Sequence, residues 1–202
     1  MENTRLNLLN KLNTLYPNGK GVEIGVFKGE FSKEILNSWD GTLYMVDVWR
    51  GLDEGYEDAS NQHGHLDAYA QTMKNISGLE DRGIMIRSTS EIASNMFQDN
   101  SIDFIYIDAN HAYDYVKDDI KFWFPKLKKG GILSGHDYLD IDWYNEPIHH
   151  PSGKDHYIYT ANGFYNGVFG VNPAVDEFCN ENGYEVKITS DDDFFQSWWI
   201  IK

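Results

Sequence analysis

Residues 22–32 read VEIGVFKGEFS, an apolar run that carries one acid and is followed by two glycines four residues apart. The periodicity predicts a short strand at 20–26 and a helix at 30–38. Gly25 and Gly29 lie where the strand leads into the helix, and the bare backbone of glycine lets a ligand approach closely there. The stretch therefore predicts a strand–turn–helix unit with a binding loop.

The rest of the chain repeats this alternation of strand and helix. Apolar runs predict strands at 43–48, 84–87 and 102–107, a fifth that opens at 132–134, and closing strands in YEVKIT and SWWIIK. Apolar residues three or four apart predict a helix from Tyr113 to Leu127, ended by Gly130 and Gly131, and another over 171–182. This alternation predicts an α/β fold with a doubly wound, mostly parallel sheet and helices on both faces.

The length of 202 residues is that of one domain, and we expect residues 1–202 to form it. Spaced leucines predict an N-terminal amphipathic helix at 4–15, whose apolar face packs either on the core or on a second subunit of a homodimer. The stretches near 51–75 and 138–166 are predicted to be loop insertions, because they are long for connections in a compact domain.

The balance of charge excludes several classes of partner. A formal net charge of −15 would repel nucleic acid, and the scattered basic residues offer no patch for an anionic membrane surface. No apolar stretch approaches the roughly 20 residues that span a membrane. The first residues lack the pattern of a signal peptide, so we expect a cytoplasmic protein. Cys179 is the only cysteine and is expected to be a small buried hydrophobe.

The spacing of the glycines limits the ligand. Gly21, Gly25 and Gly29 are four residues apart, whereas a dinucleotide-binding loop requires G-x-G-x-x-G. The loop also lacks the G-K-[ST] of a phosphate-binding P-loop. The expected ligand therefore carries no phosphates.

The E-x-G-x-x-x-G pattern of Glu23, Gly25 and Gly29 resembles the first motif of class I S-adenosylmethionine-dependent methyltransferases. The resemblance implies a Rossmann-like, seven-stranded sheet with its last strand antiparallel, and a loop that wraps the methionine part of the cofactor. It implies that Glu23 reaches the amino group of the cofactor, that Asp47 accepts the ribose hydroxyls and that Ser88 contacts the adenine. From the residues alone, the glycines also fit a turn in another α/β protein, and Asp47 also fits a surface turn.

A second group of polar residues follows the fourth and fifth strands. Asp108 and His111 come after IDFIYI, and His136 and Asp137 end the fifth strand. Because neighbouring parallel strands lie roughly 4.8 Å apart, these residues could converge on one ion or one substrate. Two carboxylates and an imidazole would suit a divalent metal of octahedral type. Asp108 could instead cap the following helix, and His136 could contact substrate rather than metal.

This second group is similar to the metal site of catechol-type, caffeoyl-coenzyme-A-type and macrocin-type O-methyltransferases. The similarity implies Asp108, His136 and Asp137 as ligands of Mg²⁺ or Mn²⁺, Asp108 beside the cofactor, and His111 at the position of the catalytic base. The expected substrate is a small hydroxylated molecule, such as a sugar or a phenol, methylated on oxygen. Two alternatives stay open: a non-catalytic small-molecule-binding protein and a metal-dependent hydrolase.

Overall fold

The computed structural model describes residues 5–50, 65–138, 157–160, 163–166, 170–189 and 196–202. Its helices are α1 (Arg5–Leu15), α2 (Glu30–Ser38), α3 (His65–Asn75), α4 (Ser90–Ser94), α5 (Tyr113–Trp123) and α6 (Val171–Asn182), with a 3₁₀ turn, η2, at Phe124–Lys126. Its strands are β1 (Lys20–Ile24), β2 (Thr42–Asp47), β3 (Gly83–Arg87), β4 (Ile102–Ile107), β5 (Leu127–Tyr138), β6 (Tyr157–Thr160), β7 (Gly163–Asn166), β8 (Lys187–Ile188) and β9 (Gln196–Ile201).

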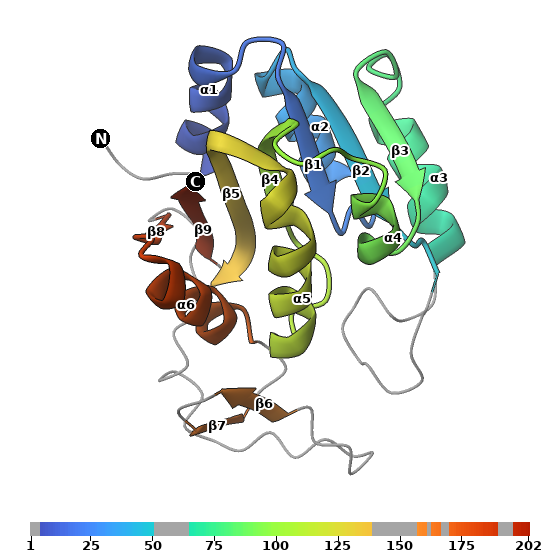
Figure 1. Cartoon of the computed structure of the whole chain (residues 1–202). Helices are drawn as coiled ribbons and strands as arrows, with labels where there is room; N and C mark the ends of the chain where they lie inside the picture. The colour runs from blue at the N-terminus through green and yellow to red at the C-terminus, as the bar shows by residue number, and fades with distance from the viewer. Residues whose placement is uncertain (1–4, 51–64, 139–156, 161–162, 167–169, 190–195) are drawn as a thin grey trace.

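Seven of these strands form one sheet in the order β3-β2-β1-β4-β5-β9-β8 (Figure 1). The first five are parallel, and β9 runs antiparallel to both β5 and β8. The chain moves outward from β1 to β3 and then returns to the other side of β1, so the order reverses between β1 and β4. Ligands of doubly wound sheets bind at the carboxyl ends of the strands at such a reversal. The predicted fold class is confirmed.

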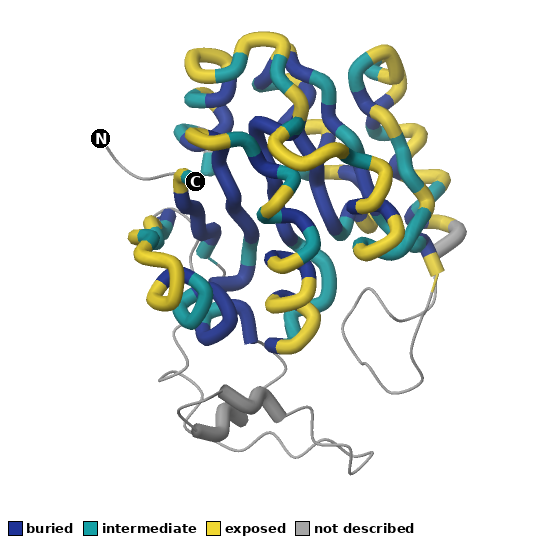
Figure 2. The backbone as a smooth tube through the Cα atoms, in the orientation of Figure 1, coloured by how far each residue is buried: buried dark blue, intermediate teal, exposed yellow. Residues whose placement is uncertain are grey.

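Helices cover both faces of the sheet with separate apolar cores. The helices α4, α5 and α6 pack on one face through residues such as Val116 and Val175, and α1, α2 and α3 pack on the other. Figure 2 shows the central strands buried between these layers, and every residue of β4 is buried. A fully buried strand of six residues explains the unbroken apolar run IDFIYI.

The N-terminal helix packs on the core of its own chain. Leu8, Leu9 and Leu12 are at most 1% exposed and lie in the cluster that also contains Ile35 and Trp199. The spacing of these leucines is that of one helix face. The sequence left open whether this apolar face packs on the core or on a second subunit, and in the structure it packs on the core.

Two predicted boundaries around the fifth strand are wrong. The helix α5 ends at Trp123 instead of continuing to Leu127, because Pro125 has no N–H for the next helical hydrogen bond. The strand β5 begins at Leu127, so Gly130 and Gly131 lie inside it and do not end the helix. Gly130 has a φ of 80° and donates its N–H to Lys202.

Part of each predicted insertion also has regular structure. Residues 65–75 form α3, and the buried residues Ala68, Thr72 and Ile76, the last just past the helix end, follow at spacings of four. The small side chain of Ala68 and the polar one of Thr72 hide this buried face from hydropathy. Residues 157–160 and 163–166 pair as an antiparallel hairpin, which lies on the side where the parallel strands end (Figure 1). The remainder of both predicted insertions, at 51–64, 139–156 and 161–162, lies outside the described residues.

None of the helices within the described ranges has the length and apolarity needed to cross a membrane.

Candidate active site at the carboxyl ends of β1, β4 and β5

The glycine loop lies directly against the end of β4. Ile24 is paired with Ile107, so the residues that follow them, Gly25 and Asp108, emerge side by side. Gly25 has a φ of 86°, and a Cβ there would lie 2.0 Å from the carbonyl oxygen of Asp108. Gly29 has a φ of 73°, and its Cβ would meet Thr72 at 2.8 Å. Both glycines are therefore required by the packing of this chain, in addition to any closeness to a ligand.

Glu23 points into the protein beneath this loop. Its side chain is 1% exposed and accepts a hydrogen bond from the Ser32 hydroxyl in the first turn of α2. Burial raises the pKa of Glu23 well above its usual range, and the charges of Asp108 and Asp47 raise it further. The hydrogen bond from Ser32 acts in the opposite direction and lowers the pKa. The contact of Glu23 with a cofactor stays a prediction.

Asp47 ties the end of β2 to the same loop. One of its oxygens, Oδ2, accepts hydrogen bonds from the N–H groups of Val26 and Phe27 at 2.9 and 2.8 Å. The other, Oδ1, accepts from the N–H of Trp49 at 2.7 Å. Ser88 lies next to it, with its N–H bonded to the Asp47 carbonyl at 3.0 Å. The structure brings both residues to one edge of the sheet, and their roles toward ribose and adenine stay predictions.

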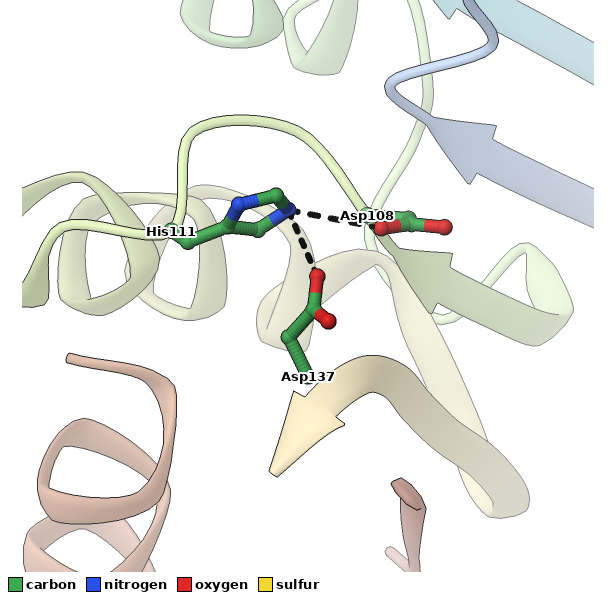
Figure 3. Close-up of side chains that lie close together, drawn as sticks. All are labelled: Asp108, His111 and Asp137. Carbon is green, nitrogen blue, oxygen red and sulfur yellow. Dashed lines mark ion pairs between the residues drawn. The ribbon is translucent and has the colours of Figure 1, made fainter. Parts of the chain in front are cut away.

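The second predicted group converges at the ends of β4 and β5. Figure 3 shows His111 pointing between the carboxylates of Asp108 and Asp137. The His111 Nε2 atom lies 2.8 Å from Asp137 Oδ2 and 3.5 Å from Asp108 Oδ1. One ligand atom from each of these three residues falls within 4.8 Å of the others. In this group His111 replaces His136, whose Nδ1 lies 3.4 Å from the other oxygen of Asp137.

Local irregularities of the backbone aim these side chains. Asp137 has a φ of 57°, in the left-handed region, and the pairing of β5 with β9 shifts register between Gly135 and Tyr138. Bulges of this kind turn a side chain out of the regular alternation of a strand. The carbonyl of His111 accepts the N–H of Gly170 at 2.6 Å, so the segment that leads into α6 fixes the loop that carries His111.

Gly170 is a site residue that the sequence reasoning missed. A Cβ at this position would lie 2.3 Å from the backbone nitrogen of Tyr113, so no larger residue fits without displacing the start of α5. The only local indication was a glycine immediately before a helical pattern. Its partner lies 59 positions earlier, at His111, and nothing in the local sequence reveals that contact.

The histidines keep Asp137 ionised although it is largely buried. Burial opposes the charge, but the hydrogen bonds from His111 and His136, together with their electrostatic attraction, outweigh it and hold the pKa of Asp137 below its usual range. Burial in turn lowers the pKa of His136, and the bond to Asp137 together with the charge of Asp108 raises it above the usual value overall. The cluster thus pairs a fixed carboxylate with imidazoles, which is an arrangement suited to proton transfer or to metal binding.

The sequence profile of a family described as "methyltransferase domain" matches residues 22–138, which is more than half of the chain. The chain belongs to this family. The match runs from the glycine loop through the acid–histidine cluster, so both predicted site regions lie within it. The resemblance to class I S-adenosylmethionine-dependent methyltransferases is confirmed.

Solved structures agree with this methyltransferase fold. An O-methyltransferase from Bacillus cereus, solved with S-adenosylhomocysteine, is 13% identical with a TM-score of 0.64, over 98% of this chain and 80% of that one. TomG from Streptomyces achromogenes, solved with S-adenosylmethionine, is 12% identical with a TM-score of 0.64, over 98% and 79% of the two chains. At such identities the likeness concerns the fold alone.

A curated relative adds little about the methyltransferase's substrate. The uncharacterized protein y4gI of Sinorhizobium fredii is 28% identical over 94 residues, which is 46% of this chain. This chain spans about a tenth of that relative's length.

Proposed function

We propose that this methyltransferase moves the methyl group of S-adenosylmethionine to an oxygen atom of a small hydroxylated molecule. The observation that carries the proposal is the convergence of Asp108, His111 and Asp137 beside Gly25, at the reversal point of the sheet. A cofactor that follows the glycine loop would end next to these three side chains. A hydroxyl group there would meet both a base and the methyl donor.

His111 is the proposed general base. Its imidazole lies 2.8 Å from the Asp137 carboxylate, which orients the ring and stabilises the cation that forms when the ring accepts a proton. In the proposed reaction His111 takes the proton of the substrate hydroxyl, the oxygen attacks the sulfonium methyl in line, and S-adenosylhomocysteine leaves. The protein supplies mainly proximity and orientation, because a sulfonium is already a good leaving group.

A divalent ion fits the same cluster. Asp108 and Asp137 offer the carboxylate oxygens that Mg²⁺ prefers, and an imidazole from His111 or His136 makes Mn²⁺ equally compatible. When bound, such an ion would lower the pKa of a coordinated substrate hydroxyl. Because Nε2 of His111 lies 2.8 Å from the Asp137 carboxylate, the nitrogen left to accept a proton is Nδ1. In a metal-loaded enzyme His136 would be the imidazole ligand and His111 the base.

A sugar or a phenol is the proposed class of substrate, because a metal-type cluster favours neighbouring hydroxyl groups. The segment after Tyr138 returns to the site at Gly170, so residues between these two anchors are the proposed source of specificity. That segment contains several tyrosines and the histidines His149, His150 and His156.

Calorimetric titration with S-adenosylhomocysteine tests the cofactor first, with NAD as the comparator and with or without Mg²⁺ or Mn²⁺. We expect binding of S-adenosylhomocysteine alone. If it does not bind, the chain is a binding module or another enzyme on this fold. A methyl-transfer assay against sugars and phenols then tests the acceptor, and a metal requirement would appear as activity lost to a chelator and restored by the ion.

Two variants separate the proposed roles. His111→Ala should slow methyl transfer by about 10²–10⁴-fold and leave the affinity for S-adenosylhomocysteine nearly unchanged, since it removes only the base. Asp47→Ala should weaken cofactor binding first. A His111→Ala protein that turns over normally, or that loses the cofactor, would contradict the assignment of the base.

A further inference from the structure

Arg5 is a partly exposed cation that no motif explains. It is the first described residue of α1, and its guanidinium carbon lies 4.5 Å from the centroid of the Phe31 ring, in the first turn of α2. The Phe31 ring lies 4.4 Å from the ring of Tyr106 on β4. Arg5 therefore joins three elements on the face of the sheet that α1 and α2 cover.

Tyr106 connects Arg5 to the strands that end at the candidate site. Its hydroxyl takes a hydrogen bond from the Arg5 side chain and shares one of 2.9 Å with Ser197. Tyr106 is paired with Glu23 across β1 and β4, so both side chains point to the same face. Asp108 follows Tyr106 by two residues, which is roughly 7 Å of extended chain.

The charges of Arg5 and Asp108 act on the same small region. Burial is the largest influence on the pKa values of Glu23, Tyr106 and His136. Among the charges that act on each of them, Asp108 raises the pKa and Arg5 lowers it. The side chains of Arg5 and Asp108 are 27% and 26% exposed, so neither is fully enclosed by the protein. Arg5 therefore acts electrostatically on residues of β1 and β4 that lie close to the candidate site.

We propose that Arg5 binds the carboxylate of the cofactor's methionine moiety. The inference rests on the proposed use of S-adenosylmethionine. A carboxylate that entered beside Asp108, Asp137 and Asp47 would be repelled unless a cation met it. The guanidinium of arginine presents paired donors that match the two oxygens of a carboxylate.

The surroundings of Arg5 favour this role over a purely structural one. The stack on Phe31 holds the guanidinium in place before a ligand arrives, which lowers the entropy lost on binding. Its ion pair with Glu34 is long, at 3.8 Å, and the Glu34 side chain is 59% exposed. An exposed pair of that kind contributes little, so a ligand carboxylate can compete with it.

The test compares S-adenosylmethionine with decarboxylated S-adenosylmethionine, which keeps the adenosine, the sulfonium and the amine. We expect the wild type to bind the first roughly 10- to 100-fold more tightly, the span of one charge-assisted hydrogen bond. In Arg5→Gln this preference should vanish, because only the affinity for the carboxylate-bearing cofactor falls. Arg5→Lys, which keeps the charge and loses the paired donors, should retain part of the preference.

Lys33→Gln is the matched control, since it removes the same charge from an exposed position of α2 and should change neither affinity. A loss of affinity for both ligands in Arg5→Gln would show a structural role and overturn the proposal, as would an unchanged preference. Thermal unfolding shows whether Arg5→Gln is folded. If it is not, the preference of Arg5→Lys for S-adenosylmethionine over the decarboxylated form decides instead. A wild type that binds neither ligand refutes the proposed function itself.

Discussion

Asp119 lies on the inner side of α5, where its carboxyl group is 6% exposed. Burial raises its pKa from 3.8 to about 7. The hydrogen bond from Ser90 lowers the pKa in part, and the charge of Asp118 adds to the rise. The Ser90 hydroxyl also accepts the indole N–H of Trp123 at 2.8 Å. This buried acid belongs to the α4–α5 contact and lies apart from the acid–histidine cluster.

The raised pKa makes stability depend on pH in a defined window. The unfolded chain releases the Asp119 proton near pH 4 and the native state only near pH 7, so the free energy of unfolding falls as pH rises between them. Asp119→Asn removes this effect. Relative to wild type, the variant should gain roughly 1–3 kcal/mol between pH 5 and 7.5 in urea denaturation. The exposed Asp114→Asn is the control, and an equal gain there would contradict the assignment.

Two other buried acids show how neighbours decide the charge. Glu23 has a hydroxyl as its bonding partner, so burial prevails and raises its pKa. Asp137 has two imidazoles, so its pKa is lowered despite burial. The same chemical group therefore has a raised pKa beneath the loop and a lowered pKa in the cluster.

Gly25 and Gly78 allow the stability cost of adding a side chain to be compared at two similar backbone positions. Both have left-handed backbones, with φ of 86° and 84°, but a Cβ on Gly25 collides with Asp108 whereas one on Gly78 meets nothing within 4 Å. Gly78→Ala should cost about 1–2 kcal/mol from the backbone conformation alone. Gly25→Ala should cost roughly 1–3 kcal/mol more and weaken S-adenosylhomocysteine binding. If urea denaturation gives the two variants the same loss of stability, the close contact between Gly25 and the backbone of Asp108 is contradicted.

At the scale of elements, α1 is an integral part of the fold. Leu12 is fully buried on the face that packs against the sheet, whereas Leu15, one turn later, is 51% exposed. Leu12→Ala should lower the free energy of unfolding by about 2–5 kcal/mol, because it leaves a cavity. Leu15→Ala should change it by less than about 0.5 kcal/mol. Chemical denaturation checks both, and a small effect at Leu12 would mean that α1 is detachable.

This packing has a consequence for the candidate site. The helix brings Arg5 beside β4 because the leucines that follow are held in the core. In the same way α6, which starts at Val171, fixes Gly170 and through it the loop that carries His111. Elements outside the glycine loop therefore position residues around the candidate site.

At the scale of the whole molecule, a formal net charge of −15 makes the native state repel itself. Added NaCl screens this repulsion over roughly 10 Å at 0.1 M, so the melting temperature should rise between low salt and 0.2 M NaCl at pH 8. Near pH 5, close to the sequence pI of 4.7, the same salt step should have a smaller effect. Equal shifts at both pH values in thermal scans would exclude self-repulsion as the cause.

The sequence alone determined the alternation of strands and helices, the glycine loop and the residues of the acid–histidine cluster. These features are local: IDFIYI is buried on both faces, and Asp108 must follow it at the edge of the sheet. Local patterns predicted two elements wrongly. The apolar spacing continued past Pro125, which ends α5, and the buried face of α3 carries Ala68 and Thr72 rather than large apolar residues.

Only the tertiary structure decided which side chains meet. It placed His111 rather than His136 between the carboxylates and turned Glu23 inward to Ser32. It also packed Arg5 on Phe31 and brought Gly170 against the loop that carries His111. Such contacts depend on the register of β1 with β4, on a bulge in β5 and on the docking of α1 and α6. The physical reason is that periodicity reports which face of an element is apolar, whereas the partner across that face is chosen by packing of the whole fold.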